Sequence, residues 1–379
     1  SYDMYDFRSE NERRTQQAAR LQLKGRAQTG AVAHDLGFSV LASQVRNRFQ
    51  KQAYNWVGYG QVDGSATTPE DPSLTLESTN RNERSLEFAV QDAIRWNDRF
   101  TTWVGLRHTR LSRDSMGTDG ASPTGYDDSL TTPWVAATYR LAPGQQVYAS
   151  YGEGVESQIV PNKAGQYSNA GVALPSLKSK QWELGIRGEA DGWKWQAAWF
   201  RIERPMTNLD ACARLFTTPC LGQYDGSAVH QGLEASTQWT QGAWRLDGGI
   251  LLLDAKRQGS IAEPATNGQR PPNVPRWTLR SQAAWRVAGV PGLELQGRLS
   301  HEARRAVLPD ASIQLPAWTR VDAALRYDTR INTMATTWTL GVDNLLGKRY
   351  WKESPYQYGH VYLFPGSPRT FRVTFQASL

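Results

Sequence analysis

No stretch of this sequence is apolar for long enough to cross a membrane as a helix. The longest apolar run, Ile250 to Leu253, falls far short of the roughly 20 residues that such a helix requires. The chain also begins without the charged and then apolar pattern of a secretory signal. These absences exclude a helical membrane span, and we expect the chain to be either mature or cut from something longer.

Clustered basic residues and grouped histidines are also missing. The net charge is +7 and the pI is near 9.4, but Lys and Arg are scattered without a block, so nothing favours a nucleic-acid partner. No G-x-S-x-G, H-E-x-x-H or P-loop motif is present. We therefore expect no enzyme, no metal and no cofactor. The histidines stand singly, without a metal-ligand pair, at His34, His108, His230, His301 and His360.

Cysteine is nearly absent, with only Cys212 and Cys220 in CARLFTTPC. Their spacing fits no zinc or thioredoxin pattern, and two thiols alone cannot hold a structural metal. We expect a disulfide within a loop, which would place this segment in an oxidising compartment such as the bacterial periplasm or cell surface. Two free thiols are the alternative.

Glycine and aromatic residues are plentiful, with 33 Gly, 15 Trp and 15 Tyr. The chain reads as about 15 strand-like runs of roughly 10 to 14 residues, longer than the usual globular strand of about 5 to 6. Tight turns alternate with long polar loops, as is typical of outer-membrane barrels. The turns are QTGAV, WNDR, APGQQ, EADGW, TQGAW, VAGVPG and TRINT. The loops are Gln50 to Arg84, Glu156 to Leu177, Met206 to Gly226, Lys256 to Val274 and Gly347 to Ser367.

Apolar and polar residues alternate within individual strands. In FRVTF, Phe371, Val373 and Phe375 point one way while Arg372 and Thr374 point the other. KQWELGIRGEA, HQGLEASTQWT and WTRVDAALRYD follow the same pattern, and their polar faces carry charges of both signs. A sheet that is apolar outside and charged inside is covered by lipid. The sequence therefore predicts an all-β protein, a transmembrane antiparallel up-and-down β-barrel.

Tryptophans collect near the ends of the predicted strands, which favours a girdle at the level of the lipid head groups. The alternative is that they are ordinary aromatic residues at the edges of a β-sandwich. The tryptophans concerned are Trp193, Trp195, Trp244, Trp277 and Trp318.

Several segments together resemble the barrel of the TonB-dependent ferric-siderophore receptors of bacterial outer membranes. EFAVQDAIRWNDRFTTWVGLRHTRL is similar to a strand, turn and strand segment of that family, and LKSKQWELGIRGEADGWKWQAAWFRIER to its Glu-Leu-Gly strand pair. The remaining similar segments follow in family order over almost all of the chain. They are QTGAVAHDLGFSV, HQGLEAS, RPPNVPRWTLR, LPAWTRVDAALRY, VDNLLGKRYW and PRTFRVTF.

The resemblance implies that residues 1–379 form the C-terminal, larger part of such a barrel. About 15 of about 22 strands are expected here. The plug domain, the TonB-contacting box and the first strands of the family have no counterpart in the sequence, so we expect a fragment or truncated product. The chain ends in Leu379, where the family usually ends in Phe. The implied function is uptake of a ferric siderophore with TonB-coupled energy by a monomer in the outer membrane, among lipid and lipopolysaccharide.

The resemblance also implies a set of ligand-binding residues in the loops. A bulky chelate would stack on loop aromatics, although any one ring can equally pack loop against loop. The expected ligand-binding residues are Tyr54, Trp56, Tyr59, Tyr126, Tyr167, Tyr224, Trp351, Tyr356, Tyr358 and Tyr362. Inner-wall charges would hydrogen-bond the plug of the complete protein, and these are Glu183, Arg187, Glu234, Arg320, Asp322, Arg326 and Asp343.

Basic residues gather near the strand ends that adjoin the long loops. Outward-pointing ones would pair with lipopolysaccharide phosphates, and inward-pointing ones would attract an anionic chelate. We favour the lipid role for most of them. They are Arg46, Arg48, Arg110, Arg113, Lys178, Lys180, Arg201, Arg204, Lys256, Arg257, Arg304 and Arg305.

Other functions stay open at this point. A receptor for haem, cobalamin or a glycan is one, and His360 with Tyr358 or Tyr362 would suit haem. A passive porin is another, and an outer-membrane hydrolase would need a polar triad on adjacent inner-wall positions.

Overall fold

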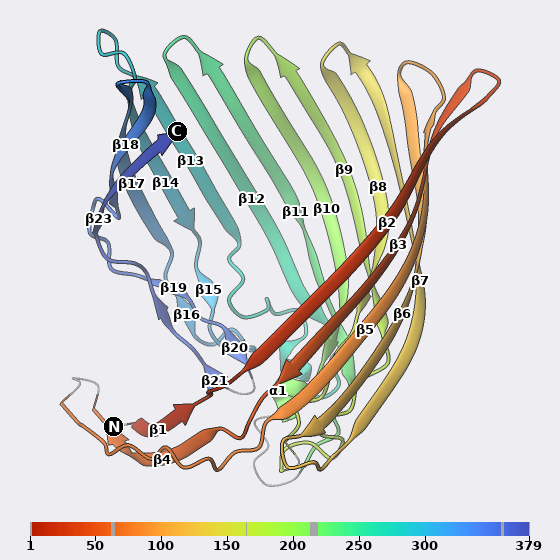
Figure 1. Ribbon diagram of the computed structural model, residues 1–379, viewed down its shortest axis with the longest axis vertical. Helices are drawn as coiled ribbons and strands as arrows, with labels where there is room; N and C mark the ends of the chain where they lie inside the picture. The colour runs from red at the N-terminus through yellow and green to blue at the C-terminus, as the bar shows by residue number, and fades with distance from the viewer. Residues whose placement is uncertain (1, 62–64, 164, 213–218, 358–359, 379) are drawn as a thin grey trace.

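One curved antiparallel sheet of fifteen strands makes up most of the molecule (Figure 1). The structure, a computed structural model, describes residues 2–61, 65–163, 165–212, 219–357 and 360–378. Neighbouring strands follow one another along the chain, as in an up-and-down meander. The strands are β2 (Arg13–Thr29), β3 (Val32–Arg48), β5 (Thr79–Arg95), β6 (Phe100–Gly117), β7 (Thr124–Ala142), β8 (Gln145–Glu156), β9 (Leu177–Ala190), β10 (Trp193–Thr207), β11 (Tyr224–Gln241), β12 (Trp244–Gln258), β13 (Trp277–Arg286), β14 (Leu293–Glu302), β17 (Trp318–Ile331), β18 (Met334–Asp343) and β23 (Thr370–Ser378).

The predicted strand number and meander are confirmed, but the wall is not closed. Strands β2 and β23 form the two edges and do not pair with each other. Both run toward the end of the wall that carries the tight turns, because β2 leads into a tight turn and the end of β23 pairs with the start of β18. An antiparallel closure therefore requires an odd number of further strands between them.

Short elements occupy the opposite end, which carries the long loops. Strand β1 (Tyr2–Arg8) pairs with β4 (Ala53–Gly60), extending the hairpin of β2 and β3 beyond the main sheet. The other short elements are β15 (Arg305–Ala306), β16 (Gln314–Leu315), β19 (Trp351–Glu353), β20 (Tyr356–Gln357), β21 (His360–Val361), β22 (Phe364–Pro365), α1 (Leu209–Cys212) and the 3-10 turn η1 (Pro264–Thr266). None of the described helices is long and apolar enough to cross a membrane.

The predicted tight turns all join neighbouring strands at one end of the wall, called here the tight-turn end. In the turn between β9 and β10, Asp191 and Gly192 both have positive φ, 48° and 78°. Consecutive left-handed residues match the right-handed twist of the two strands, which explains the Asp-Gly pair. This turn also lies close to its neighbour, because Thr240 donates its backbone N–H to Gly192 O at 3.0 Å.

We expect Gly192→Ala to destabilise the protein more than Gly30→Ala. Both glycines have positive φ in tight turns, so each alanine carries the left-handed penalty of about 1–2 kcal/mol. A Cβ on Gly192 would lie 2.4 Å from Thr240 O, whereas nothing lies within 4 Å of a Cβ on Gly30. The clash should add about 1–3 kcal/mol. Urea unfolding in detergent, followed by tryptophan fluorescence, measures both, and equal losses would contradict this prediction.

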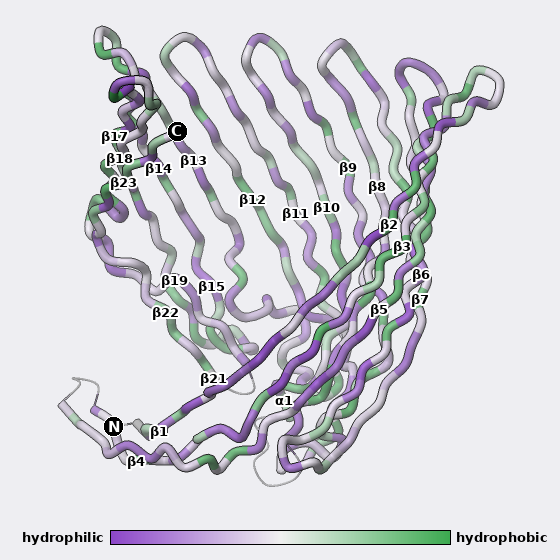
Figure 2. The backbone as a smooth tube through the Cα atoms, viewed as in Figure 1, coloured by the Kyte–Doolittle hydropathy of each residue, from purple (hydrophilic) through white to green (hydrophobic). Residues whose placement is uncertain are grey.

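The two faces of the wall differ as predicted. One apolar row crosses five neighbouring strands and comprises Trp285, Leu295, Leu325, Leu340 and Val373. The adjacent row faces the other way and comprises Arg286, Glu294, Arg326, Thr339 and Thr374. The polar face lines a hollow of about 1450 Å³ inside the curve near the tight-turn end. Figure 2 shows hydrophobic and hydrophilic residues alternating along the strands.

No described layer covers the apolar face. Leu184, Leu233 and Leu340 are 58%, 54% and 50% exposed, and Phe371 on the edge strand is 74% exposed. The cluster of buried apolar side chains lies in the loops, around Val160. Apolar rows left open to this extent on a continuous wall fit a hydrocarbon solvent.

Several strands are longer than the predicted 10 to 14 residues. Strands β6 and β11 have 18 residues and β7 has 19, because the ladders continue past the apolar band toward the long loops. This overturns part of the loop assignment. Tyr126 lies within β7, Tyr224 begins β11, and residues 79–84 belong to β5.

Three of the five tryptophans predicted for the girdle lie at one end of the wall, and Trp277 begins β13 at the other end. Trp193, Trp195 and Trp244 lie at the tight-turn end, and Trp244 stacks on Trp285 with ring centroids 5.8 Å apart. Trp318 was wrongly placed in it, because its side chain is only 6% exposed. It lies on the polar face of the wall, because it pairs with Glu302, whose side chain is on that face.

The last long loop is tied to the wall by a buried asparagine. The Asn344 side chain donates to Lys348 O at 2.8 Å and Ser367 O at 3.0 Å, and accepts from Lys348 N at 2.8 Å. Its own backbone N–H donates to Asp322 at 2.7 Å. Asn344 has a φ of 53°, a conformation that asparagine tolerates better than most residues. One side chain thus fixes both ends of the loop.

Candidate functional site

An exposed aromatic surface stands at the long-loop end, on the small sheet of β1 and β4. Exposed and covered residues alternate along β1 and the first half of β4, and a register shift at Val57 keeps Tyr59 on the same face. Tyr5, Phe7, Tyr54, Trp56 and Tyr59 are 46–62% exposed. The register brings Tyr5 opposite Trp56 and Phe7 opposite Tyr54. We call these five rings the aromatic face.

The rings of the aromatic face order one another. Tyr5 stacks on Tyr54 with centroids 4.8 Å apart and planes 10° apart, and Phe7 meets Tyr54 edge-on at 6.0 Å. Trp56 meets Tyr59 edge-on at 5.3 Å, and its indole Nε1 donates to the Asp3 carboxylate at 3.0 Å. Such pairs hold exposed rings in fixed orientations, which suits a stacking surface.

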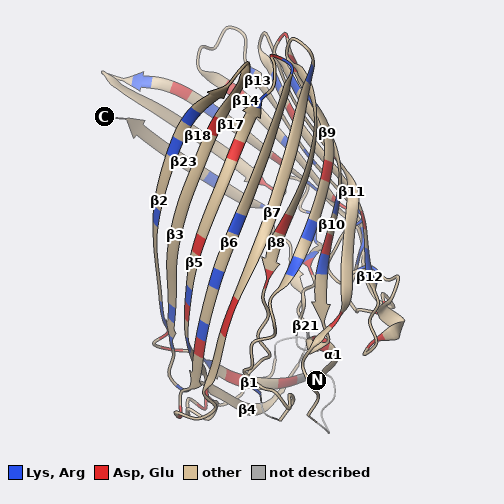
Figure 3. Cartoon of the chain, turned by 90° about the vertical axis from the view of Figure 1, so that its right-hand side faces the viewer, with Lys and Arg blue, Asp and Glu red and all other residues tan. Residues whose placement is uncertain are grey.

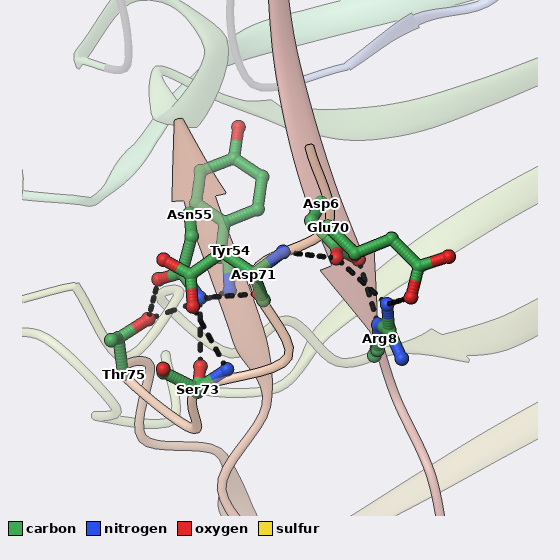
Figure 4. Close-up of polar contacts among 8 residues, drawn as sticks. All are labelled: Asp6, Arg8, Tyr54, Asn55, Glu70, Asp71, Ser73 and Thr75. Atoms are coloured by element: carbon green, nitrogen blue, oxygen red, sulfur yellow. Dashed lines mark hydrogen bonds and ion pairs between the residues drawn. The ribbon is translucent and has the colours of Figure 1, made fainter. Parts of the chain in front are cut away.

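A polar network holds the opposite side of this small sheet (Figure 4). Arg8 donates two hydrogen bonds to Asp6, each 2.9 Å, and one to Glu70 at 2.9 Å. These hydrogen bonds hold the pKa of Asp6 below its usual value. The Asp6 carboxylate also accepts from the backbone N–H of Asp71 at 2.8 Å. The network therefore joins the segment from Glu70 to Asp71 to β1.

Asn55 fastens the same segment to β4. Its side-chain amide donates to Asp71 O and Ser73 O, both at 2.8 Å, and accepts a hydrogen bond from the Thr75 hydroxyl. Asn55 is 8% exposed, next to the fully buried Ala53. With one side closed by residues 70–75, the two strands present only the aromatic face outward.

The last loop brings one more predicted residue near this face. Partial burial raises the pKa of Tyr54, and the neighbouring Tyr5 and Tyr362 add to the rise. Tyr362 is 47% exposed and follows β21, far from β4 in sequence. Tyr54, Trp56 and Tyr59 thus share one face, and Tyr362 lies close enough to Tyr54 to act on it electrostatically. Trp351 and Tyr356 lie on β19 and β20 of the same loop, and Tyr358 lies outside the described residues.

Three predicted residues lie elsewhere. The Tyr126 hydroxyl donates to Asp128 at 2.6 Å and lies 2.7 Å from the Ser176 hydroxyl. Tyr167 is 1% exposed and donates to Leu209 O at 2.8 Å, so it packs loop against loop. Tyr224 packs against the same loop core.

That loop core contains the two cysteines, which form a disulfide with Cα atoms 5.4 Å apart. Cys212 is fully buried beside Val160 and Tyr167, and Leu209 completes the contact between the two loops. The disulfide therefore crosslinks a packed region instead of a free loop tip.

The seven residues expected on the inner wall all lie on the polar face, and most have partners there. Arg320 pairs with Asp322 at 2.9 Å, and Asp343 pairs with Arg372 at 2.7 Å. Tyr148 donates to Glu183 at 2.5 Å while the Arg187 guanidinium lies over the Tyr148 ring. Arg326 pairs with Asp328 at 3.1 Å.

Sequence reasoning missed Tyr5, Phe7 and Asp3, although a signal was present. YDMYDFR alternates aromatic with polar residues at the period of a strand, but its pairing with AYNWVGYG joins segments about 50 residues apart, which no local pattern indicates. In the described part of the chain, no three His, Cys, Asp or Glu side chains gather as a metal site would require.

Comparison with known proteins gives a consistent result. Residues 1–345 match the family described as TonB dependent receptor-like, beta-barrel. The ferrichrome receptor FcuA of Yersinia enterocolitica is 23% identical over 377 residues, which cover 93% of this chain and 47% of that protein. The ferrioxamine B receptor of Salmonella typhimurium is 26% identical over 344 residues, covering 87% of this chain and 46% of that protein.

Among solved structures, BauA, the ferric preacinetobactin receptor of Acinetobacter baumannii, superimposes with a TM-score of 0.79 at 24% identity. The match covers 96% of this chain and 54% of BauA, and it shows the shared fold. The chain spans about half the length of the curated relatives that it matches.

Proposed function

This chain belongs to the TonB-dependent receptor β-barrel family, and on that premise we propose that it is the C-terminal, larger part of the barrel of a ferric-siderophore receptor. The family consists of receptors in the bacterial outer membrane, so this is the membrane that covers the apolar face. The long-loop end then faces outside the cell and the tight-turn end faces the periplasm.

The aromatic face is the observation that best supports capture of a siderophore. It presents five exposed rings in fixed orientations at the outer end of the barrel. A bulky ferric chelate offers flat, polarisable groups that stack on such rings. Two of the relatives are named as receptors for ferrichrome and for ferrioxamine B.

The inner wall supplies the second half of the proposal. Arg187 lines the hollow, and the pairs Arg320–Asp322 and Asp343–Arg372 lie on the same polar face of the wall. A plug from the rest of the receptor would lie against this face, accept hydrogen bonds from these charged groups and donate hydrogen bonds to them. Energy from TonB would act on the plug. The receptor would work as a monomer surrounded by lipid and lipopolysaccharide, and would carry out no reaction on its cargo. The ferric ion is cargo within the siderophore, and no resident cofactor is required.

Uptake of labelled iron tests this proposal. The complete receptor that carries this chain is produced in a bacterium without its own siderophore receptors, under iron limitation, and supplied with iron-labelled ferrichrome, ferrioxamine B or other ferric siderophores. We expect saturable uptake of at least one, reduced about tenfold or more when TonB is deleted. Uptake that persists without TonB would indicate a passive pore instead.

A further inference from the structure

We propose that Asn273 and Arg305 are positioning residues for siderophore capture, because they hold the last long loop in one arrangement at the outer mouth of the barrel. The proposal rests on the receptor function given above. The last long loop carries three of the predicted ligand-binding rings, Trp351, Tyr356 and Tyr362. Figure 3 shows its strand β21 at the end of the wall opposite the tight turns. Asn273 and Arg305 lie outside that loop, after β12 and after β14 respectively.

Three long loops meet at the side chain of Asn273. Its amide oxygen accepts a hydrogen bond from the Arg305 guanidinium at 3.0 Å and another from the backbone N–H of Ser354 at 2.9 Å. The backbone N–H of Asn273 donates to Ala306 O at 2.8 Å. The loop after β12 is therefore joined to the loop after β14 and to the last long loop. We call Asn273, Arg305 and Ser354 the loop junction.

Arg305 places a buried charge at this junction. It is 5% exposed, and its guanidinium forms an ion pair with Glu302 of β14, whose other carboxylate oxygen pairs with Arg280 of β13. A buried ion pair loses much of its attraction to desolvation, so apolar residues of similar volume would stabilise the loops as well or better. Its contribution is specificity, because the charges keep their partners in only one arrangement of the loops.

The hold on Ser354 extends to an exposed ring near the tip of the last long loop. Ser354 is fully buried, and the carbonyl oxygen of the next residue, Pro355, accepts the backbone N–H of Tyr362 at 3.0 Å. Between these points β20 and β21 pair Tyr356 with Val361. Tyr362 is 47% exposed, so a fixed Ser354 fixes a ring that a ligand can reach. A loop that is ordered beforehand loses less conformational entropy on binding and therefore binds more tightly.

The base of the same loop is anchored independently. Asn344 holds both ends of the loop, and the next residue, Leu345, donates its backbone N–H to Val321 O of the wall at 2.7 Å. Neither contact involves the loop junction. Loss of the junction should therefore free the tip of the loop and leave its base in place.

The test measures backbone hydrogen exchange in the complete receptor in mild detergent, by mass spectrometry with fragmentation to single amides. The test variant is Asn273→Gly, which removes the accepting oxygen at a φ of 62° that glycine adopts without strain. The matched control is Asn332→Gly, the same change at a φ of 57° in the tight turn between β17 and β18. Asn273→Asp is the conservative variant, because it retains an accepting oxygen.

We expect the amides of Ser354 and Tyr362 to exchange about tenfold or more faster in Asn273→Gly, and that of Leu345 to change by less than about twofold. Tyr362 is the informative position, because the substitution leaves its own acceptor, Pro355 O, unchanged. Asn273→Asp and Asn332→Gly should leave all three amides near their unaltered rates. Unchanged exchange at Tyr362, or equal acceleration at Leu345, would overturn the proposal.

Arg305→Met tests the contribution of the buried charge. It removes the charge but keeps an unbranched side chain, and Glu302 retains Arg280 as its partner. We expect the amides of Ser354 and Tyr362 to exchange faster in this variant too, because Asn273 is then no longer held. Unchanged exchange would show that Arg305 takes no part in positioning.

Siderophore affinity then separates a role in capture from a purely structural one. With a siderophore that the unaltered receptor takes up, Asn273→Gly should bind about three- to tenfold more weakly, and Asn273→Asp should restore the affinity. Faster exchange with unchanged affinity would show that the junction orders the loop without serving capture. A complete receptor that takes up no siderophore would refute the receptor proposal and leave the exchange result standing.

Discussion

Residues 1–379, exported without any additional strands, should yield less than about a tenth of the folded barrel that the complete receptor yields. The reason is the open edge of β2, which is 17 residues long and pairs on one side only. The second edge, β23, is 9 residues long. In hydrocarbon no water satisfies the backbone groups along these edges.

The free-energy cost of leaving these backbone groups without hydrogen bonds explains the low expected yield. Each unsatisfied backbone group in a bilayer costs several kcal/mol, and about half of the groups of an edge strand face away from its only partner. Even four such groups therefore cost about as much as the 5–15 kcal/mol that typically stabilises a folded protein. The apolar face cannot offset this cost, because it gains the same hydrocarbon contact in a closed barrel.

The direction of the two edges sharpens this prediction. Because β2 and β23 run the same way, only an odd number of supplied strands pairs antiparallel at both edges. Co-expression of the preceding strands of the complete receptor should restore the folded form, as judged by heat-modifiable electrophoretic mobility of outer-membrane extracts. The same segment shortened by one strand is the matched control and should restore little. A stable, ion-conducting pore formed by the 379 residues alone would refute the closure argument.

The wall itself could be predicted from the sequence, because its signals are local. The alternation of Phe371, Val373 and Phe375 with polar residues predicts which side chains share the apolar face. Pairs such as Asp191-Gly192 predict where the tight turns lie. These two signals suffice when each strand pairs with the next in sequence. Strand ends were less predictable, since ladders continue past the bilayer wherever neighbouring backbones still match, as at Tyr126.

The site could not be predicted to the same extent, because its contacts are long-range. Nothing local shows that Tyr5 stacks on Tyr54 or that Tyr362 lies near them. Trp318 lies near a strand end, as the girdle residues do. However, it is two residues from Arg320 on the same strand, so its side chain is on the polar face. A ring in a polar segment is thus assigned a role only when its partners are known.

The second large effect concerns the aromatic face. Tyr54→Ala combined with Trp56→Ala should weaken siderophore binding by the complete receptor by about 30-fold or more, since each lost stacking contact is worth about 0.5–1.5 kcal/mol beyond the buried area. Tyr54 is the centre of the face, where Tyr5 stacks on it and Phe7 meets its edge, so its loss also releases those two rings. Isothermal titration with the siderophore identified by uptake measures the affinity.

The control variants distinguish stacking from general damage. Trp193→Ala with Trp244→Ala removes two rings of nearly equal exposure, 48% and 46%, at the opposite end of the barrel, and should leave affinity unchanged. Tyr54→Phe with Trp56→Phe keeps flat rings and should retain most of the affinity, although it loses the Trp56 hydrogen bond to Asp3. If the alanine pair and the phenylalanine pair bind equally well, the rings serve only to pack the small sheet. In that case the ligand contacts would have to come from the other long loops or from the inner wall, where charged residues pair along the strands.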